Sequence, residues 1–413
     1  MFGHPANGET PEWHLLVFFS PSIIVLARVP GRGVRPEGLS SHECLMPSSS
    51  QPFMEQGRGG CGHTSLTMAI VIVVASVFLT SLAAACPIPC TCPISGSVVD
   101  CGGLHLLCLP SRLPDGVRLL ELSHNNLSHL LVGTFQGLWG LRVLLLSHNI
   151  LRDLSGGALG GLSFLEQLDL SHNQLAHLPP DFSATLGSLL RLDLSHNLLT
   201  SLDPSSLWRL GSLEQLDLSH NQLAELIAGV FGGLFRLHWL SLAGNQLQRV
   251  EGAALAVMPG LEVLSLAGND ISELEAKAFA TLGALGLLSL VGNRLQHLEF
   301  KAVAGIRTAG TRLLLADNPW TCDCDLQRAF GKLGHLRHLR VVDLGNLTCA
   351  GPERLSGAVL SGVEAQLCLA ETATVLGITG AVLLTVAVAV LMAERKRRQG
   401  PEEAGELGSF LER

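Results

Sequence analysis

The chain has 413 residues, which is long enough for a large core. Its formal net charge is −8, and only 15% of the residues are charged whereas 47% are hydrophobic. Because the regular part of the chain carries no broad basic stripe, these values argue against nucleic acid as a partner.

Residues 1–67 are rich in Gly, Pro and Ser and show no repeated pattern. We interpret them as a disordered leader or as an over-extended start, with Met54 or Met68 as the actual initiator. Residues 68–85 are an apolar run that ends in small residues, and Ala83 and Ala85 fit the A-x-A pattern of a cleavage site. We therefore expect a secretory signal peptide here; an uncleaved first membrane anchor is the alternative.

From Asn125 on, an asparagine recurs every 24 residues within the frame L-x-x-L-x-L-x-x-N-x-L, which is the leucine-rich repeat pattern. The series is Asn125, Asn149, Asn173, Asn197, Asn221, Asn245, Asn269 and Asn293, with Asn318 one residue late. In one unit, Leu168 and Leu170 point inward from a short strand and Asp169 points outward, because side chains alternate along a strand. A single unit cannot bury its leucines. We therefore expect residues 117–318 to form an α/β solenoid of about nine stacked repeats, with parallel strands along its concave face.

Cysteines cluster at both ends of the repeats. Cys86, Cys90, Cys92 and Cys101 precede them, and Cys322, Cys324, Cys349 and Cys368 follow them. Cys101 stands 24 residues before Asn125, so we expect it to take the place of a first asparagine. Because a solenoid exposes its core at both ends, residues 86–116 and 319–368 are expected to be caps. Zinc binding is the alternative for four such cysteines, and an oxidising compartment disfavours it.

Over residues 86–368, the repeats and the two cysteine clusters resemble extracellular leucine-rich repeat proteins with N-terminal and C-terminal cysteine caps. The resemblance implies a horseshoe fold and the disulfides Cys86–Cys92, Cys90–Cys101, Cys322–Cys349 and Cys324–Cys368. Cys108 is then left over. An exposed odd thiol predicts a disulfide-linked dimer, and a small buried residue of the first cap is the alternative.

Residues 373–393 contain no charged side chain and are long enough to cross a bilayer as a helix. Glu394 and then Arg395–Arg398 follow at once, and a basic cluster after a span favours the cytoplasmic side. We expect a single-pass type I protein of the plasma membrane, with the repeats outside and a short tail, 394–413. The sequons at Asn126 and Asn346 are predicted glycosylation sites in that topology.

The outward strand positions predict the binding face. Asp169, Asp193 and Asp217 form one column beside Arg191, and like charges at strand spacing favour a cationic partner group. Solvated carboxylates of a common repeat are the alternative. An apolar group follows in the later repeats, and tryptophan is enriched at interface hot spots; its members are Trp239, Val263, Leu287, Val291 and Leu314. Its alternative is cover by the C-terminal cap or by a glycan.

A histidine also precedes each of the first five asparagines, and the series is His124, His148, His172, His196 and His220. A structural role is favoured over pH sensing or metal binding, because a straight file of rings does not converge on an ion. The frame contains no catalytic motif such as G-x-S-x-G or H-E-x-x-H. We therefore expect no enzyme, no cofactor and no metal.

The predicted function is binding of a protein ligand. The layout is similar to single-span cell-surface leucine-rich repeat proteins that act in adhesion, ligand recognition or receptor regulation. It also resembles the gamma auxiliary subunits of large-conductance potassium channels, with one span and a basic cluster. In that alternative, Val386–Met392 and Arg395–Arg398 would act beside a channel. The number of repeats is higher here than in that group, which counts against it.

Overall fold

The structure is a computed structural model that describes residues 86–93, 96–110, 113–363 and 366–399, with only the backbone described for 366–373, 398 and 399. The predicted leader (1–67), the predicted signal peptide (68–85) and most of the predicted tail (400–413) lie outside the described residues.

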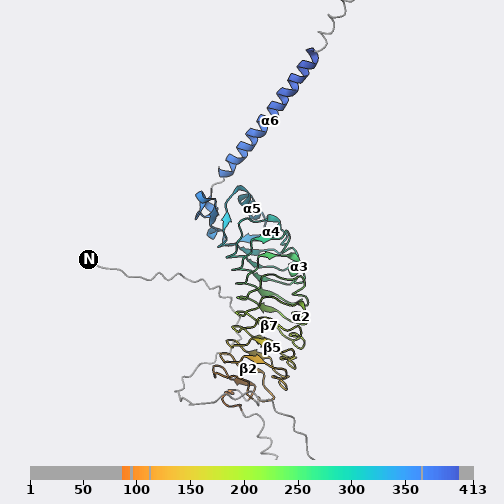
Figure 1. The fold of residues 1–413 in the computed structure, drawn as a ribbon, viewed down its shortest axis with the longest axis vertical. Coiled ribbons are helices and arrows are strands. Elements are labelled where there is room, and N and C mark those ends of the chain that lie inside the picture. The colour runs from red at the N-terminus through yellow and green to blue at the C-terminus, as the bar shows by residue number, and fades with distance from the viewer. Residues whose placement is uncertain (1–85, 94–95, 111–112, 364–365, 400–413) are drawn as a thin grey trace, which may run out of the picture. The chain divides into compact units, whose positions relative to one another are not determined.

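One long parallel sheet organises the repeats (Figure 1). Within the described ranges it has 11 strands, which follow one another in chain order. They are β1 (Val98–Asp100), β2 (Leu119–Glu121), β4 (Val143–Leu145), β6 (Gln167–Asp169), β7 (Arg191–Asp193), β8 (Gln215–Asp217), β9 (Trp239–Ser241), β11 (Val263–Ser265), β13 (Leu287–Ser289), β14 (Thr311–Leu314) and β16 (Leu339–Val341). Leu168 pairs with Leu192, 24 residues on, so the sequence period is also the register of the sheet. The predicted solenoid is confirmed.

The leucines of the frame form a single core. In most strands the middle residue is buried and its neighbours are partly exposed, for example Leu168 between Gln167 and Asp169. Leu165, Leu168 and Leu170 of that repeat are all fully buried. Burial of one such side chain stabilises the fold by about 2 kcal/mol, and stacking repeats this gain at every turn.

The asparagines hold neighbouring turns together. The side-chain amide of Asn173 donates to the carbonyl oxygens of Leu170 and Leu146, each at 3.0 Å. Its Oδ1 accepts from the backbone N–H of Leu151, also at 3.0 Å. Leu146 and Leu151 belong to the preceding turn, so each asparagine links its own turn to the one before. The polar backbone groups next to the core are satisfied in this way.

Turns and short elements form the opposite, outer side. Its helices are α2 (Pro204–Leu207), α3 (Gly252–Leu255) and α4 (Phe300–Ala304). Two-residue strands pair as β3 (His129–Leu130) with β5 (Asp153–Leu154) and as β10 (Arg249–Val250) with β12 (Glu273–Leu274). Phe135, Phe231 and Phe279 are fully buried beneath these turns.

The N-terminal cap corrects one prediction. Its disulfides are Cys86–Cys92 and Cys90–Cys101, the pairs that the resemblance implied. In the sheet, however, Asp100 pairs with Glu121, which places Cys101 beside Leu122. The carbonyl oxygen of Cys101 accepts a hydrogen bond from Asn125 Nδ2 at 2.8 Å, just as the carbonyl oxygen of Leu122 accepts one from Asn149 Nδ2. The prediction that Cys101 replaces an asparagine is therefore wrong, because the first turn is three residues shorter than the repeat.

The C-terminal cap contains α5 (Cys324–Gly334), β15 (Trp320–Thr321) paired with β17 (Cys349–Gly351), and the 3-10 turns η1 (Leu344–Asn346), η2 (Glu353–Leu355) and η3 (Leu360–Gly362). Cys322 bonds to Cys349, and Cys324 is also disulfide-bonded. The side chain of its predicted partner Cys368 lies outside the described residues, so that pair stays a prediction.

Asp343 closes the C-terminal end of the repeats. Its Oδ2 accepts from the backbone N–H groups of Leu315 and Ala316, both at 2.7 Å. In the repeat before, Leu290 is the equivalent of Leu315, and its backbone N–H donates instead to the carbonyl oxygen of Leu314 in the following turn. The carboxylate therefore takes the place of a further turn.

After the cap comes α6 (Gln366–Gln399). Within the described part of the chain, its segment Thr374–Arg397 is the one helix that is long and apolar enough to cross a membrane, with a mean hydropathy of 2.5. The predicted span, 373–393, falls within this helix.

Candidate binding face

On the inner face of the sheet, two rows of side chains point away from the core. From β2 to β13 the first residue of each strand is paired with the first residue of the next, and in β14 and β16 the second residue continues this row. From β2 to β16 this first row is Leu119, Val143, Gln167, Arg191, Gln215, Trp239, Val263, Leu287, Arg312 and Arg340. The second row is Glu121, Leu145, Asp169, Asp193, Asp217, Ser241, Ser265, Ser289 and Leu314.

The predicted acidic column is present in the second row. Asp169 pairs in register with Asp193, and Asp193 pairs with Asp217. Each carboxylate accepts a hydrogen bond from the backbone N–H two residues on, as Asp193 Oδ1 does from Ser195 at 2.9 Å. These bonds fix the three carboxylates beside one another at strand spacing.

The carboxylates are less solvated than the sequence suggested. The pKa of Asp193 is raised to about 6, chiefly by burial; the Ser195 hydrogen bonds oppose this rise, and the charges of Asp217 and Asp169 add to it. Burial also raises the pKa of Asp217 and of Glu121. A cationic group that docked on the column would stabilise the ionised forms.

The predicted apolar group is narrower than its sequence positions implied. Trp239, Val263 and Leu287 lie side by side in the first row, on three adjacent strands, and each is half-buried. Leu314 lies in the second row beside Ser289. Val291 follows β13 and packs partly against the core. We call Trp239, Val263 and Leu287 the apolar strip.

Different side chains border the apolar strip at its two ends. Gln215 precedes it, and the Oε1 of Gln215 is a buried acceptor with no hydrogen-bond partner among the described residues. Arg312 and then Arg340 follow it, and both are exposed. The place of Arg340 was missed in the sequence, because β16 comes from the cap and lies outside the repeat frame.

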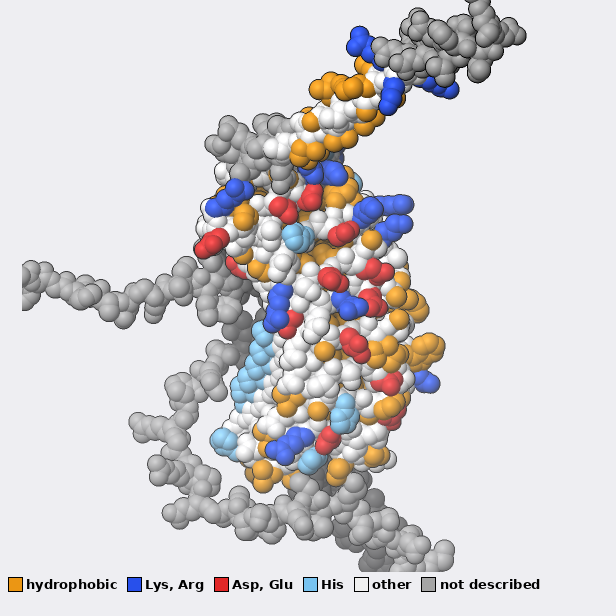
Figure 2. Space-filling view, turned by 45° about the horizontal axis from the view of Figure 1, so that its top comes forward, with side chains coloured by type: hydrophobic (Ala, Val, Ile, Leu, Met, Phe, Trp, Pro, Cys, Tyr) orange, Lys and Arg blue, Asp and Glu red, His pale blue; other side chains and the backbone are white. Residues whose placement is uncertain are grey.

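A file of exposed histidines borders the sheet, seen in pale blue in Figure 2. Their rings stack with centroids 4.1 to 4.3 Å apart. All five residues have a left-handed backbone, with φ between 51° and 58°. In the later repeats glycine fills this position, and Gly244, Gly268 and Gly292 also have positive φ. The change from His to Gly therefore preserves one backbone conformation, a reason that the sequence alone did not reveal.

Burial lowers the pKa of His148 and of His196, and neighbouring histidines of the file lower it further. These two rings therefore favour the neutral form at neutral pH. Among the residues that the structure describes, no group of three or more His, Cys, Asp or Glu side chains is placed to hold a metal ion.

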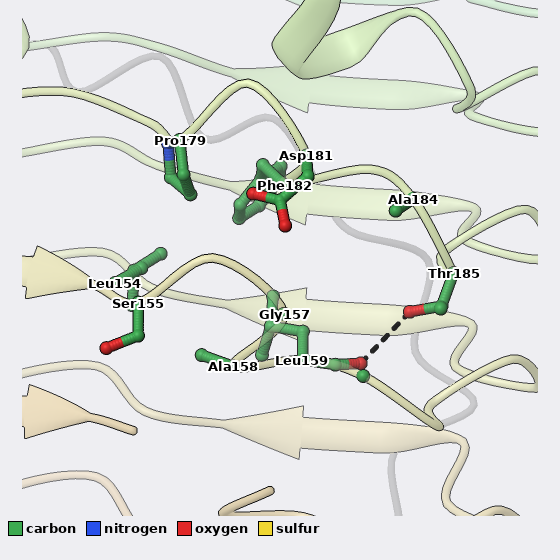
Figure 3. Close-up of a pocket in the computed structure, with 11 residues that line it drawn as sticks. Leu154, Ser155, Gly157, Ala158, Leu159, Pro179, Asp181, Phe182, Ala184 and Thr185 are labelled. Atoms are coloured by element: carbon green, nitrogen blue, oxygen red, sulfur yellow. Dashed lines mark hydrogen bonds between the residues drawn. The ribbon is translucent and has the colours of Figure 1, made fainter. Parts of the chain in front are cut away.

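A small hollow lies on the outer side between two neighbouring turns (Figure 3). Leu154, Ala158 and Leu159 line it from one turn and Phe182 from the next, and Thr185 Oγ1 donates across it to the carbonyl of Leu159 at 3.1 Å. Its volume of about 30 Å³ is far below the several hundred Å³ of a typical ligand pocket. It is therefore not a small-molecule site.

The remaining predicted sites lie at the surface. Asn126 and Asn346 are exposed, so both sequons are sterically accessible. Cys108 is exposed too, which fits the odd-thiol interpretation and not the buried one.

Comparisons with known proteins agree with this geometry. A family model described as leucine rich repeat matches residues 115–175, 165–223 and 235–295. The rat leucine-rich repeat-containing protein 55 is 36% identical over 69 residues, which cover 17% of this chain and 22% of that protein. The chain thus spans about a fifth of that curated relative.

Two solved structures show the same fold. Human 5T4 (trophoblast glycoprotein) is 28% identical, with a TM-score of 0.53, over 68% of this chain and 98% of that one. A chain of the Drosophila Toll–Spatzle complex is 25% identical, with a TM-score of 0.55, over 63% of this chain and 37% of that one.

Proposed function

Because this chain is a leucine-rich repeat protein, we propose that it is a cell-surface module that binds a protein ligand on the inner face of its sheet. The apolar strip carries the proposal. Trp239, Val263 and Leu287 are fixed in register on three adjacent strands, so they offer a continuous apolar surface without rearrangement. A large aromatic anchor among polar neighbours has the composition of a binding hot spot.

The surroundings of the strip support a protein ligand. The carboxylates of Asp193 and Asp217 lie on the two strands before the apolar strip and suit a cationic side chain of the ligand. The exposed side chain of Arg191 lies on the same strand as Asp193. The open face favours a macromolecular surface over a small molecule. One of the similar structures is itself a protein complex, that of Toll with Spatzle.

The C-terminal helix supports a position at the plasma membrane. The apolar helix segment Thr374–Arg397 has the length of a span, and Arg395, Lys396 and Arg397 stand at its end. By the positive-inside rule this end faces the cytoplasm, which leaves the repeats outside in a type I orientation. We expect glycans at the exposed Asn126 and Asn346 in this topology.

The test is a screen with the full-length chain on cells against a library of cell-surface proteins. The change Trp239→Ala should abolish binding of the ligand found while surface expression stays unchanged. The matched control is Trp208→Ala, because Trp208 is an equally large side chain, 64% exposed, away from the strip. Ligand binding that survives Trp239→Ala, or that is lost with Trp208→Ala instead, would reject the strip as the site.

A second candidate function rests on α6. Its exposed apolar segment, which includes Val386–Met392 and ends at the basic residues 395–397, would act beside a potassium channel as an auxiliary subunit. The experiment is to fuse residues 369–413 to an unrelated ectodomain and to co-express the fusion with a large-conductance potassium channel. A shift in voltage dependence supports this role, and unchanged gating with both the fusion and the full chain rejects it.

A further inference from the structure

Four exposed arginines lie on the last two strands of the sheet or in the loops that lead into them. Arg312 on β14 pairs in register with Arg340 on β16. The loops that lead into these strands carry Arg307 and Arg337, which are exposed as well. A hydrogen bond of 2.9 Å from the N–H of Thr311 to the carbonyl of His338 holds the two loops together. We call these four residues the C-terminal arginine cluster.

None of the four arginines makes an ion pair with a described residue, whereas Arg142, Arg294 and Arg328 each do. The sequence explains the difference, because segments 305–314 and 335–342 contain no Asp or Glu. The chain as a whole has a net charge of −8, so this local excess of positive charge is not a general property of its surface. Like charges held at strand spacing repel one another, and a bound anion would remove that repulsion.

The backbone beneath the cluster is rigid. Leu313 and Leu339, which alternate with Arg312 and Arg340, are buried in the core. The Cys322–Cys349 disulfide ties the surrounding cap together. The guanidinium groups are therefore presented from fixed positions, and each can bind a sulfate, phosphate or carboxylate through two parallel hydrogen bonds.

We propose that the C-terminal arginine cluster binds a sulfated polysaccharide. Several guanidinium groups at short spacing match a polymer with repeated anionic groups better than they match a single ion. A flat lipid surface is disfavoured, because Arg312 and Arg340 lie on the inner face of the sheet, which a flexible chain enters more readily. An acidic protein is an outcome of the test, because Leu287 of the apolar strip pairs in register with Arg312 and would give such a partner one apolar anchor.

This site adjoins the apolar strip at Leu287 but takes a ligand of a different class, and the proposal goes beyond the proposed function. Heparin is the probe, measured against the full-length chain in neutral phosphatidylcholine nanodiscs. Binding should weaken as salt rises, because charge contacts of this kind release counterions. The double change Arg312→Glu with Arg340→Glu should raise the dissociation constant at least about tenfold and reduce the slope of log affinity against log salt by about two.

One control variant and one further test variant complete the experiment. Arg249→Glu changes an exposed arginine at the start of β10 on the outer side and should alter heparin affinity less than about twofold. Arg307→Glu with Arg337→Glu changes only the loops, so it tests the cluster even if the strand variant does not fold. Thermal unfolding reports whether each variant is folded.

Further probes separate the sources of anionic groups. Desulfated heparin, phosphatidylserine vesicles and polyglutamate should each bind at least about tenfold more weakly than heparin. The proposal is overturned if folded wild-type chain does not bind heparin, if both double variants bind it as wild type does, or if vesicles or polyglutamate bind as tightly as heparin.

Discussion

The imidazole rings of His148 and His172 stack with centroids 4.1 Å apart and planes 9° from parallel, and both residues have a left-handed backbone. The strand spacing of the sheet sets the separation, because each ring rises from the same point of consecutive turns. Backbone conformation and ring stacking therefore impose separate requirements on this position, and they can be tested separately.

The backbone requirement predicts opposite results for two changes at His172. His172→Gly should leave stability nearly unchanged, because glycine adopts the φ of 51° without strain. His172→Val should lower the free energy of unfolding by about 2 kcal/mol, because a β-branched residue is a steric outlier there. Denaturant unfolding of both variants checks this, and an equal loss of stability in the two would show that the ring and not the backbone matters.

The histidine file predicts a loss of stability on acidification. Folding lowers the pKa of His148 and His196, so the folded state resists protonation more than the unfolded state. Their contribution is complete above the unfolded pKa of about 6.5 and is lost as pH falls from that value through the lower folded pKa. The double change to Asn, which tolerates a left-handed backbone, should flatten the fall in melting temperature between pH 7 and pH 5. An identical pH profile in the variant would exclude the file as its source.

Asp193 predicts the opposite dependence. Its folded pKa of about 6 lies above the unfolded value of 3.8, so the folded state binds the proton more tightly. The stabilising contribution is therefore present below pH 3.8 and is lost as pH rises through 6. Asp193→Asn should raise the unfolding free energy by about 1–3 kcal/mol at pH 7 and by about half as much at pH 5. The measurement is denaturant unfolding at the two pH values, and a gain that does not depend on pH would contradict this account.

Asp343 predicts a stability effect at the end of the sheet. Asp343→Ala leaves the backbone N–H groups of Leu315 and Ala316 without their acceptor, which should cost about 2–3 kcal/mol. Asp343→Asn keeps an acceptor oxygen and should restore part of the loss. Asp325→Ala is the control, because that exposed carboxylate pairs only with Arg328 at the surface. In thermal unfolding, Asp343→Ala should lose the most stability, Asp343→Asn less, and Asp325→Ala the least.

Cys108 predicts a covalent dimer. Its exposed thiol has no partner in the described part of the chain, and an oxidising compartment favours its pairing with a second copy. The wild-type chain should run partly as a dimer on a non-reducing gel, and Cys108→Ser should run as a monomer. A dimer that persists in the variant would assign the bond to another cysteine.

The repeat frame predicted the strands and the buried leucines because both depend on one local period. It did not predict the place of Cys101, since the first turn is three residues shorter than the repeat. It missed Arg340 and Asp343 for a related reason, because both belong to the cap, which carries no frame. The exchange of His for Gly was visible in the sequence, but its cause is a backbone angle that residue identity alone does not specify. The pairing in the caps came from family resemblance and not from spacing.

The hydrogen bonds of Asn173 reach only its own turn and the one before it, and the same holds for the other ladder asparagines. Consecutive turns are therefore linked by the same asparagine hydrogen bonds, whatever the number of turns that follow. If duplication or deletion in the gene added or removed one whole turn, the hydrogen bonds between the turns on either side would still form. The length of the ligand-facing surface can thus evolve in whole-turn steps, while the apolar interior needs no redesign.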